Sequence, residues 1–318
     1  MAAPSTMVAV RADRYGPPEV LRLYEAPTPR PRANEVRVRI EASAVTASDI
    51  YIRSGVVARR LQVPFRLMMG ITRPRAKILG LVFAGVVDEC GASITRFRPG
   101  DEVYGITNFS LGAYAQYVCT PETDARAHGC IARRPGALSA EESTALGYGG
   151  LLALQYLVPD AIRGGERVLV YGASGTSGTL AVQLAKQRGA HVTAVCGPTN
   201  LALARALGAD EVLDYTSDDM PTGTYDLVLD SVGPTKSSPL KAACRAAVAP
   251  DGRWSSIGDG SLQSVSNRLD QLTAAADAGS LRPVLGATYT LAEIVEAHRF
   301  VETGHKVGGV ALTHASRD

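Results

Sequence analysis

The second half of the chain alternates short, wholly apolar runs with stretches whose apolar residues follow helical spacing. The clearest unit begins at Val168 and ends at Cys196. Residues 168–171 predict a buried parallel strand, and a turn of small residues follows it. The next stretch has apolar residues at 180, 182, 184 and 185 and ends at Gly189, which predicts a helix. Because residues 191–195 predict a second strand, the pattern is typical of a nucleotide-binding βαβ unit.

Small residues fill the turn between that strand and helix, and we interpret them as a phosphate-binding loop: Gly172, Ala173, Ser174, Gly175, Thr176, Ser177 and Gly178. A dinucleotide pyrophosphate must approach backbone N–H groups at the start of the helix. A Cβ at Gly175 or Gly178 would block that approach or the packing of helix on strand. Ala173 replaces the first glycine of the usual GxGxxG pattern, so the alternative is a glycine-rich turn of another α/β protein. The register of strand, turn, helix and second strand favours the dinucleotide site.

The alternation continues to residue 258, with helices expected at 200–207 and 240–248 and strands at 211–213, 225–230 and 253–258. Helices between parallel strands predict a doubly wound sheet, so the fold class is α/β. Upstream, short β segments at 7–11, 35–44, 81–90, 101–105 and 114–119 predict a partly open barrel or sandwich. A helix over 140–157 links the two parts. The C-terminal residues predict helices at 267–278 and 291–303 and a last strand at 309–312.

Composition limits the class of protein. A chain of 318 residues with 46% hydrophobic and 20% charged residues indicates about two globular domains. No apolar run reaches membrane-spanning length and the first residues resemble no signal peptide, so we expect a cytoplasmic protein with no membrane partner. The five cysteines form no CxxC pair, which argues against a disulfide framework or a zinc ribbon. A net charge of +2 gives no case for nucleic acid.

One stretch departs from this charge balance. No acid occurs between Asp49 and Asp88, whereas seven basic residues do: Arg53, Arg59, Arg60, Arg66, Arg73, Arg75 and Lys77. A solvated rim around a pocket would explain them. The alternative is a docking surface for an acidic partner or an anionic substrate, such as an acyl carrier protein or a CoA ester.

Several motifs together resemble a known family. They are residues 49–55, 97–105 and 112–118, the glycine turn at 172–178, residues 225–233, and residues 281–284 with Glu296-Ala297-His298. The chain resembles the medium-chain dehydrogenases/reductases, and among them the zinc-free quinone oxidoreductases related to zeta-crystallin. The resemblance implies a GroES-like, β-rich catalytic domain formed by residues 1–133 and 267–318, and a Rossmann domain at residues 134–266. It places the substrate in the cleft between them.

The same resemblance indicates which residues of this chain stand at the positions of the catalytic zinc ligands. Zinc-dependent relatives carry a cysteine where this chain has Thr46 and a His-Glu pair where it has Leu81-Val82, and their four-cysteine loop is absent here. A hydroxyl and two aliphatic groups cannot form the thiolate and imidazole shell of catalytic zinc. We therefore expect no metal, and reduction of an activated C=C by hydride transfer: a quinone, an enone or an enoyl thioester.

Two catalytic candidates follow from the resemblance. Tyr51 matches a family tyrosine beside the cofactor and is our first candidate for the proton donor, although it could merely line the cleft. Thr46 stands where the family has an asparagine beside the nicotinamide. The substrate would be a small or carrier-bound unsaturated molecule.

Cofactor preference depends on the end of the second strand, where an acid would bind the 2′-hydroxyl of NAD. Residues 196–200 include no acid, so NADPH is favoured and NADH stays possible. Arg205 or Lys186 could supply a cation for the 2′-phosphate, and Tyr215 could stack near the adenine. With the glycine turn, the full set of candidate cofactor contacts adds Cys196, Thr199, Asn200, Tyr215, Ser231, Val232, Gly233, Ile257 and Gly258.

Some positions depart from the family. Thr46, Leu152 and Gly309 each replace a polar side chain of the relatives, and residues 258–267 are too few for the strand that usually pairs two subunits. We therefore expect a monomer or a non-standard homodimer. The same departures leave a second hypothesis open, in which the chain has lost redox turnover and acts as a non-redox catalyst or binding protein in the cleft.

Overall fold

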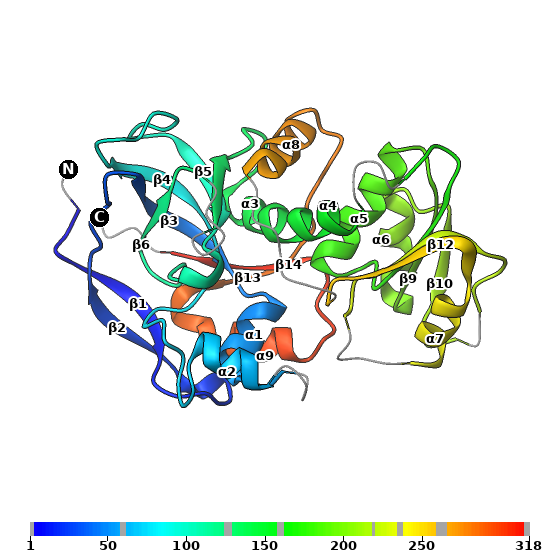
Figure 1. Ribbon diagram of the computed structural model, residues 1–318, viewed down its shortest axis with the longest axis horizontal. Coiled ribbons are helices and arrows are strands. Elements are labelled where there is room, and N and C mark those ends of the chain that lie inside the picture. Colours follow the sequence, from blue (N-terminus) through cyan, green and yellow to red (C-terminus); the bar gives the residue numbers. More distant parts are fainter. Residues whose placement is uncertain are drawn as a thin grey trace.

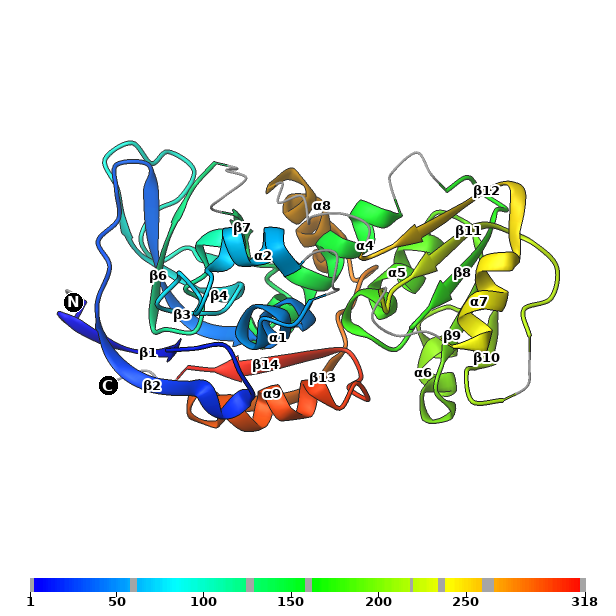
Figure 2. The ribbon, with the colours of Figure 1, turned by 60° about the horizontal axis from the view of Figure 1, so that its bottom comes forward.

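Two lobes make up the computed structural model, a β-rich lobe and a lobe built on a parallel sheet (Figure 1). The structure describes residues 3–57, 62–123, 129–157, 162–217, 220–233, 238–258 and 266–314. Both ends of the chain lie in the β-rich lobe, and the parallel sheet is formed by the segment between them (Figures 1 and 2). This arrangement confirms the predicted fold class of a GroES-like β-rich part with a Rossmann-like part.

A seven-stranded sheet forms the β-rich lobe, in the order β13-β14-β3-β4-β5-β7 with β6 paired to β3. Its strands are β3 (Glu35–Ala44), β4 (Val82–Cys90), β5 (Glu102–Ile106), β6 (Tyr117–Pro121), β7 (Cys130–Arg133), β13 (Leu285–Thr290) and β14 (Gly309–Thr313). A hairpin of β1 (Thr6–Ala12) and β2 (Leu21–Pro27) adds a small second sheet. The helices of this lobe are α1 (Ala47–Ser54), α2 (Gln62–Met69), α8 (Ser266–Asp277) and α9 (Ile294–Glu302), with short 3-10 turns at Pro18–Val20, Asn108–Ser110 and Leu291–Glu293.

Five parallel strands form the other lobe, in the order β10-β9-β8-β11-β12. They are β8 (Arg167–Tyr171), β9 (His191–Cys196), β10 (Glu211–Asp214), β11 (Tyr225–Asp230) and β12 (Val248–Ser256). Their connections contain α5 (Thr176–Gln187), α6 (Leu201–Ala206), α7 (Pro239–Ala246) and the turn η5 (Pro198–Asn200). The chain builds outward from β8 to β10 and then returns to place β11 on the other side of β8.

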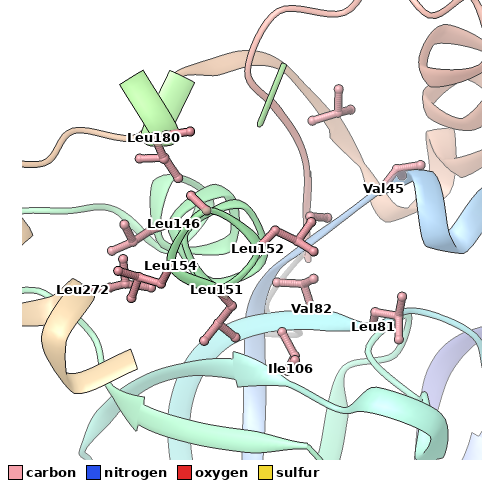
Figure 3. Close-up of a cluster of buried hydrophobic side chains, with 14 of the residues drawn as sticks. Val45, Leu81, Val82, Ile106, Leu146, Leu151, Leu152, Leu154, Leu180 and Leu272 are labelled. Carbon is pink, nitrogen blue, oxygen red and sulfur yellow. The ribbon is translucent and has the colours of Figure 1, made fainter. Parts of the chain in front are cut away.

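The linking helix joins the two lobes. It consists of α3 (Ala140–Ala145), a π-helical turn, η4 (Leu146–Gly150), and α4 (Leu151–Tyr156). α3 packs against β3 and β14, whereas α4 packs against α5. Leucines of this helix lie in one apolar cluster with side chains from both lobes (Figure 3). Leu152 belongs to that cluster and is 6% exposed, so it serves as a packing residue there.

Most predicted elements are present. Residues 35–44 and 225–230 form strands with the predicted limits, and the linking helix occupies 140–156. Within it, a π turn at Leu146–Gly150 separates two α-helical parts, a detail that the sequence did not predict. Strands β2, β7 and β13 had not been predicted. The domain limits at residues 133 and 267 stay a prediction.

Candidate functional site

The strand order of the parallel sheet locates a crevice. β8 and β11 are neighbours, but their following connections lead to opposite sides of the sheet. In open α/β sheets, ligands bind outside the carboxyl ends of the strands at such a switch point. Gly172 follows β8 and Ser231 follows β11, and the N–H of Ser231 donates to the carbonyl of Tyr171 at 2.8 Å. Two of the predicted cofactor segments therefore meet at this point.

The glycine turn has the geometry expected of a close backbone approach. Gly172 adopts a φ of +83°, and a Cβ at Gly178 would lie 2.2 Å from the carbonyl oxygen of Gly172. Gly175 is the N-cap of α5. Apart from its chain neighbours, a Cβ there would meet one atom of the described residues within 4 Å, the same carbonyl oxygen at 3.5 Å. Gly178 is thus required by helix–strand packing, whereas Gly175 borders open space. The first N–H groups of a helix have no partner inside it, so this turn can bind an anion.

The remaining residues of the turn attach it to its surroundings. The N–H groups of Gly172 and Ala173 donate to the carbonyl of Val195, at 3.0 and 2.9 Å, which fixes the turn on β9. Ser177 lies 3.2 Å from the hydroxyl of Ser231, and the carbonyl of Ser174 accepts from the N–H of Gly308 at 2.8 Å. The turn is thereby held between the two lobes.

Tyr215 lies close to the residues at the end of β9. The N–H of Tyr215 donates to the carbonyl of Cys196 at 3.1 Å, and a Cβ on Gly197 would lie 3.3 Å from the Tyr215 ring. The ring is 44% exposed, and Thr199 is exposed beside it, with Asn200 half-buried. Cys196 is buried, which raises the pKa of its thiol to about 11, so the thiol is neutral and unreactive at pH 7.

The two cations that could reach a 2′-phosphate differ in their surroundings. Lys186 is already engaged in an ion pair, because its ammonium lies 2.8 Å from the carboxylate of Asp210 near the C-terminal end of α5. Arg205 is exposed and close enough to Cys196 to lower the pKa of that thiol, against the larger effects of burial and of Asp214. Arg205 is therefore the better placed of the two.

The segment after β11 is organised by a buried carboxylate. Asp230 is 1% exposed, and its Oδ1 accepts from the N–H groups of Val232 and Gly233, both at 3.1 Å. Its Oδ2 pairs with the ammonium of Lys241 at 2.7 Å. Ile257, half-buried, donates its N–H to the carbonyl of Asp230 at 3.0 Å, and Gly258 follows it on the surface. These contacts fix the shape of the crevice on the β11 side.

Lys306 also belongs to the site, although sequence reasoning missed it. Its ammonium donates to the Thr176 hydroxyl at 2.6 Å and to the Gly308 carbonyl at 2.7 Å, at the first turn of α5. Burial lowers its pKa to about 8. The relatives' lysine corresponds to Gly309, where a Cβ would lie 2.6 Å from the Cβ of Ala145. Lys306, three residues before Gly309 in the chain, places a cation beside the glycine turn.

A cavity of about 480 Å³ opens beside the glycine turn. Its lining is mainly apolar: Ser48, Tyr51, Ile52, Val57, Pro64, Phe65, Met68, Met69, Leu81, Ile106, Asn108, Phe109 and Tyr148. Tyr148 lies in the π turn, and a Cβ on the next residue, Gly149, would be only 2.6 Å from the carbonyl oxygen of Thr176. The π turn therefore brings the cavity wall against the start of α5.

Hydroxyl groups supply the polar part of the cavity. Tyr51 lies on α1 and lines the cavity, and the hydroxyls of Ser48 and Tyr148 are 2.7 Å apart. Burial raises the pKa of Tyr148, so its phenol keeps its proton at pH 7. Sequence reasoning missed Ser48 and Tyr148. A tyrosine flanked by glycines within an apolar helix was the available signal for Tyr148.

Thr46 begins α1 through a capping box. Its N–H and hydroxyl both donate to Oδ2 of Asp49, at 2.9 and 2.6 Å, and the N–H of Asp49 donates back at 3.3 Å. Asp49 is 2% exposed, and burial raises its pKa to about 6. Thr46 is itself buried, so the structure gives it a role in holding the helix that carries Ser48 and Tyr51.

The residues that replace zinc ligands are Thr46, Leu81, which lines the cavity, and Val82, which is wholly buried in β4. Within the described ranges, no three His, Cys, Asp or Glu side chains gather so that they could hold a metal ion. Likewise, no helix in those ranges is long and apolar enough to cross a membrane.

The basic stretch is only partly described, because Arg59 and Arg60 lie outside the described residues. Arg66 is engaged internally: its guanidinium lies 3.9 Å from the Tyr15 ring centroid and donates to the Ile71 carbonyl at 3.1 Å. The exposed cations are those of the loop that follows α2, namely Arg73, Arg75 and Lys77. None of these three residues lines the cavity.

Comparisons with known proteins agree with this geometry. Two family models match, an alcohol dehydrogenase GroES-like domain over residues 32–162 and a zinc-binding dehydrogenase over residues 178–301. The mitochondrial NAD(P)H oxidoreductase RTN4IP1 of Mus musculus is 31% identical, over 96% of this chain and 89% of its own length. A chloroplastic quinone-oxidoreductase homolog of Spinacia oleracea is 35% identical, over 71% of this chain and 68% of its own. A solved quinone oxidoreductase from Coxiella burnetii superposes with a TM-score of 0.83 at 27% identity, covering 97% of this chain and 99% of that one.

Proposed function

The chain belongs to the medium-chain dehydrogenases/reductases, with quinone and NAD(P)H oxidoreductases as relatives, and we propose that it reduces an activated C=C without a metal. The substrate class is a quinone, an enone or an enoyl thioester. The observation that carries this proposal is the apolar cavity of about 480 Å³ whose wall, at Tyr148, adjoins the start of α5.

The residues present fit a nicotinamide dinucleotide. Gly178 lets α5 pack on the turn, Gly175 leaves space beside the first helical N–H groups, and Lys306 adds a cation there. We assign the adenosine end to the surface around Gly197, Tyr215 and Arg205, with NADPH as the preferred cofactor. When bound, the nicotinamide supplies a hydride to the β-carbon of the substrate.

The chain's own residues would handle the charge and the proton. Addition of hydride leaves negative charge on the substrate oxygen, which the Ser48–Tyr148 hydroxyl pair can stabilise by hydrogen bonds in an apolar surrounding. Tyr51 stays our candidate for the proton donor to the α-carbon. Thr46 acts as a positioning residue, because its hydroxyl is already used to cap α1.

The side chains at the positions of the zinc ligands do not suit a zinc ion. Thr46, Leu81 and Val82 offer one neutral hydroxyl and two aliphatic side chains where zinc-dependent relatives need thiolate and imidazole. A carbonyl reduction that depends on a Lewis acid is therefore disfavoured, whereas an activated C=C needs only hydrogen bonds and a proton.

The first experiment titrates NADPH and NADH by fluorescence and then follows the loss of reduced cofactor with a panel of quinones, enones and enoyl thioesters. Tyr51→Phe is expected to lower turnover roughly a hundredfold, in the range of general acid catalysis, with little change in nucleotide affinity. Tyr148→Phe tests the oxyanion contact in the same assay. Failure of both nucleotides to bind would end the proposal, and binding without any oxidation would favour the non-redox alternative.

Subunit arrangement is a second part of the proposal. β12 is the edge strand of the parallel sheet in the described ranges, and α8 begins at Ser266 shortly after it. We propose a monomer or a homodimer that does not use the family's usual additional edge strand. A dimer by light scattering, with cross-links that show the family's usual edge-to-edge pairing through a strand supplied from elsewhere in the chain, would contradict this.

A further inference from the structure

Large apolar side chains are unevenly distributed over the surface. Nine of them are exposed among the residues that the structure describes. Six of the nine, with exposed fractions of 43% to 69%, come from α2, the residues that flank it and the 3-10 turn at Asn108–Ser110, which are segments that also line the cavity: Val56, Val63, Leu67, Met68, Ile71 and Phe109. A cluster of this kind marks a contact surface more often than isolated exposed residues do. We call these six residues the apolar rim.

The apolar rim is continuous with the cavity. Met68 and Phe109 belong to both, and Val57 and Pro64 line the cavity next to rim residues in the chain. Val63 and Leu67 are four residues apart on α2, which places them on one face of the helix. Figure 2 shows α2 at the front of the β-rich lobe. An apolar surface therefore leads from the outside of the molecule into the cavity.

Positive charge accompanies the apolar rim. Arg73, Arg75 and Lys77 are exposed on the loop directly after α2, and no acid occurs in the sequence between Asp49 and Asp88. Within the described part of the chain these three cations form no ion pair. The guanidinium of Arg66 holds the loop to α2 through the Ile71 carbonyl. The loop thus keeps its cations next to the rim without an acid to neutralise them.

We propose that the apolar rim and the loop 71–77 dock on the surface of an anionic lipid membrane. Exposed apolar side chains gain free energy by entering the headgroup and acyl boundary, and flanking cations are attracted by anionic lipid headgroups. An acidic soluble partner would match the cations but would leave most of the rim in water. No membrane partner was expected from the absence of a spanning segment, but a surface contact needs none.

Docking in this orientation places the cavity mouth against the bilayer. The substrate that fits such a route is an amphiphile, with an activated C=C on a polar head and an apolar chain that stays in the lipid. This part of the inference rests on the proposed function, because it concerns the same cavity. The membrane contact itself does not depend on turnover.

Co-sedimentation with vesicles tests the contact on the full chain. We expect binding to phosphatidylcholine vesicles that contain phosphatidylglycerol, weak binding to phosphatidylcholine alone, and loss of binding at high salt. Leu67→Asp, which lies outside the cavity lining, is expected to lower the partition coefficient about tenfold or more. Replacing Arg73, Arg75 and Lys77 together with Gln is expected to lower it about a hundredfold, since each surface cation contributes about fivefold.

Met220→Asp is the matched control. Met220 is 50% exposed, comparable with the rim, but belongs to the other lobe and is expected to leave vesicle binding unchanged. Thermal unfolding checks that every variant is folded. Equal binding to both vesicle types, or wild-type binding by Leu67→Asp, would overturn the proposal. So would a dimer that Leu67→Asp dissociates, or tight binding to an acyl carrier protein without binding to vesicles. Because no step measures turnover, failure here is distinct from failure of the proposed function.

Discussion

Substituting Gly178 or Gly175 in the glycine turn should affect different properties, namely the packing of the helix for Gly178 and the binding of the nucleotide for Gly175. In Gly178→Ala, the new Cβ would lie 2.2 Å from the Gly172 oxygen and 2.8 Å from the Ala173 Cα, both backbone atoms. Overpacking costs about 3 kcal/mol when only backbone can move, and the gain in helix propensity offsets about 1 kcal/mol. The net loss of about 2 kcal/mol corresponds to a melting temperature lower by roughly 4–8 °C.

Gly175→Ala is the matched variant. Among the described residues beyond its chain neighbours, its Cβ would meet the Gly172 oxygen alone, at an ordinary 3.5 Å. Its φ of −77° suits alanine, so we expect a stability change within about 1 kcal/mol. The Cβ would nevertheless occupy the space through which a pyrophosphate approaches, and NADPH affinity should fall about tenfold or more. Thermal unfolding and fluorescence titration give both quantities. An unchanged melting temperature in Gly178→Ala would refute the packing argument, and wild-type affinity in Gly175→Ala would refute the pyrophosphate assignment.

Three further predictions concern charged residues of the site. Burial raises the pKa of Asp49 in the folded state from 3.8 to about 6, so the folded state binds a proton more tightly than the unfolded state does. The free energy of unfolding should therefore fall by roughly 3 kcal/mol as the pH rises from about 4 to about 6. Asp49→Asn should remove this pH dependence in unfolding titrations. Lys306→Met should weaken the binding of both NADPH and NADH about tenfold, as measured by fluorescence. The wild-type protein should lose nucleotide affinity above pH 8, where Lys306 loses its proton, and the variant should not. An unchanged pH profile in the variant would contradict this role of Lys306. Arg205→Ala should weaken NADPH about tenfold and NADH little, with Lys186→Ala as the control; equal effects on both nucleotides would exclude a 2′-phosphate contact.

Sequence reasoning located the elements whose pattern is local. Residues 225–230 have the apolar centre Leu227-Val228-Leu229 because the strand they form, β11, lies between β8 and β12 and is buried on both faces. β2 and β13 were missed because five of the seven positions of β2 and all six of β13 are exposed or half-exposed, so neither has a strong apolar period. The glycine turn was found because its spacing is set by one strand and one helix.

Contacts between distant parts of the chain explain the rest. Lys306 reaches Thr176 across 130 positions of sequence, so nothing near residue 306 indicates its proximity to the turn. Tyr148 faces the cavity because a π turn shifts the register of the linking helix, and helical periodicity does not predict that shift. Thr46 was identified by position, but its capping contact with Asp49 was not foreseen.

We propose above that this chain catalyses nicotinamide-dependent reduction of an activated C=C without a metal. The most direct test incubates the protein with a strong chelator, removes the chelator, and measures NADPH oxidised and substrate reduced in one reaction with a quinone or enone. We expect equimolar consumption of NADPH and formation of the reduced product, at the same rate as in protein that was not treated with the chelator. Activity that disappears with the chelator and returns with Zn²⁺ would contradict it.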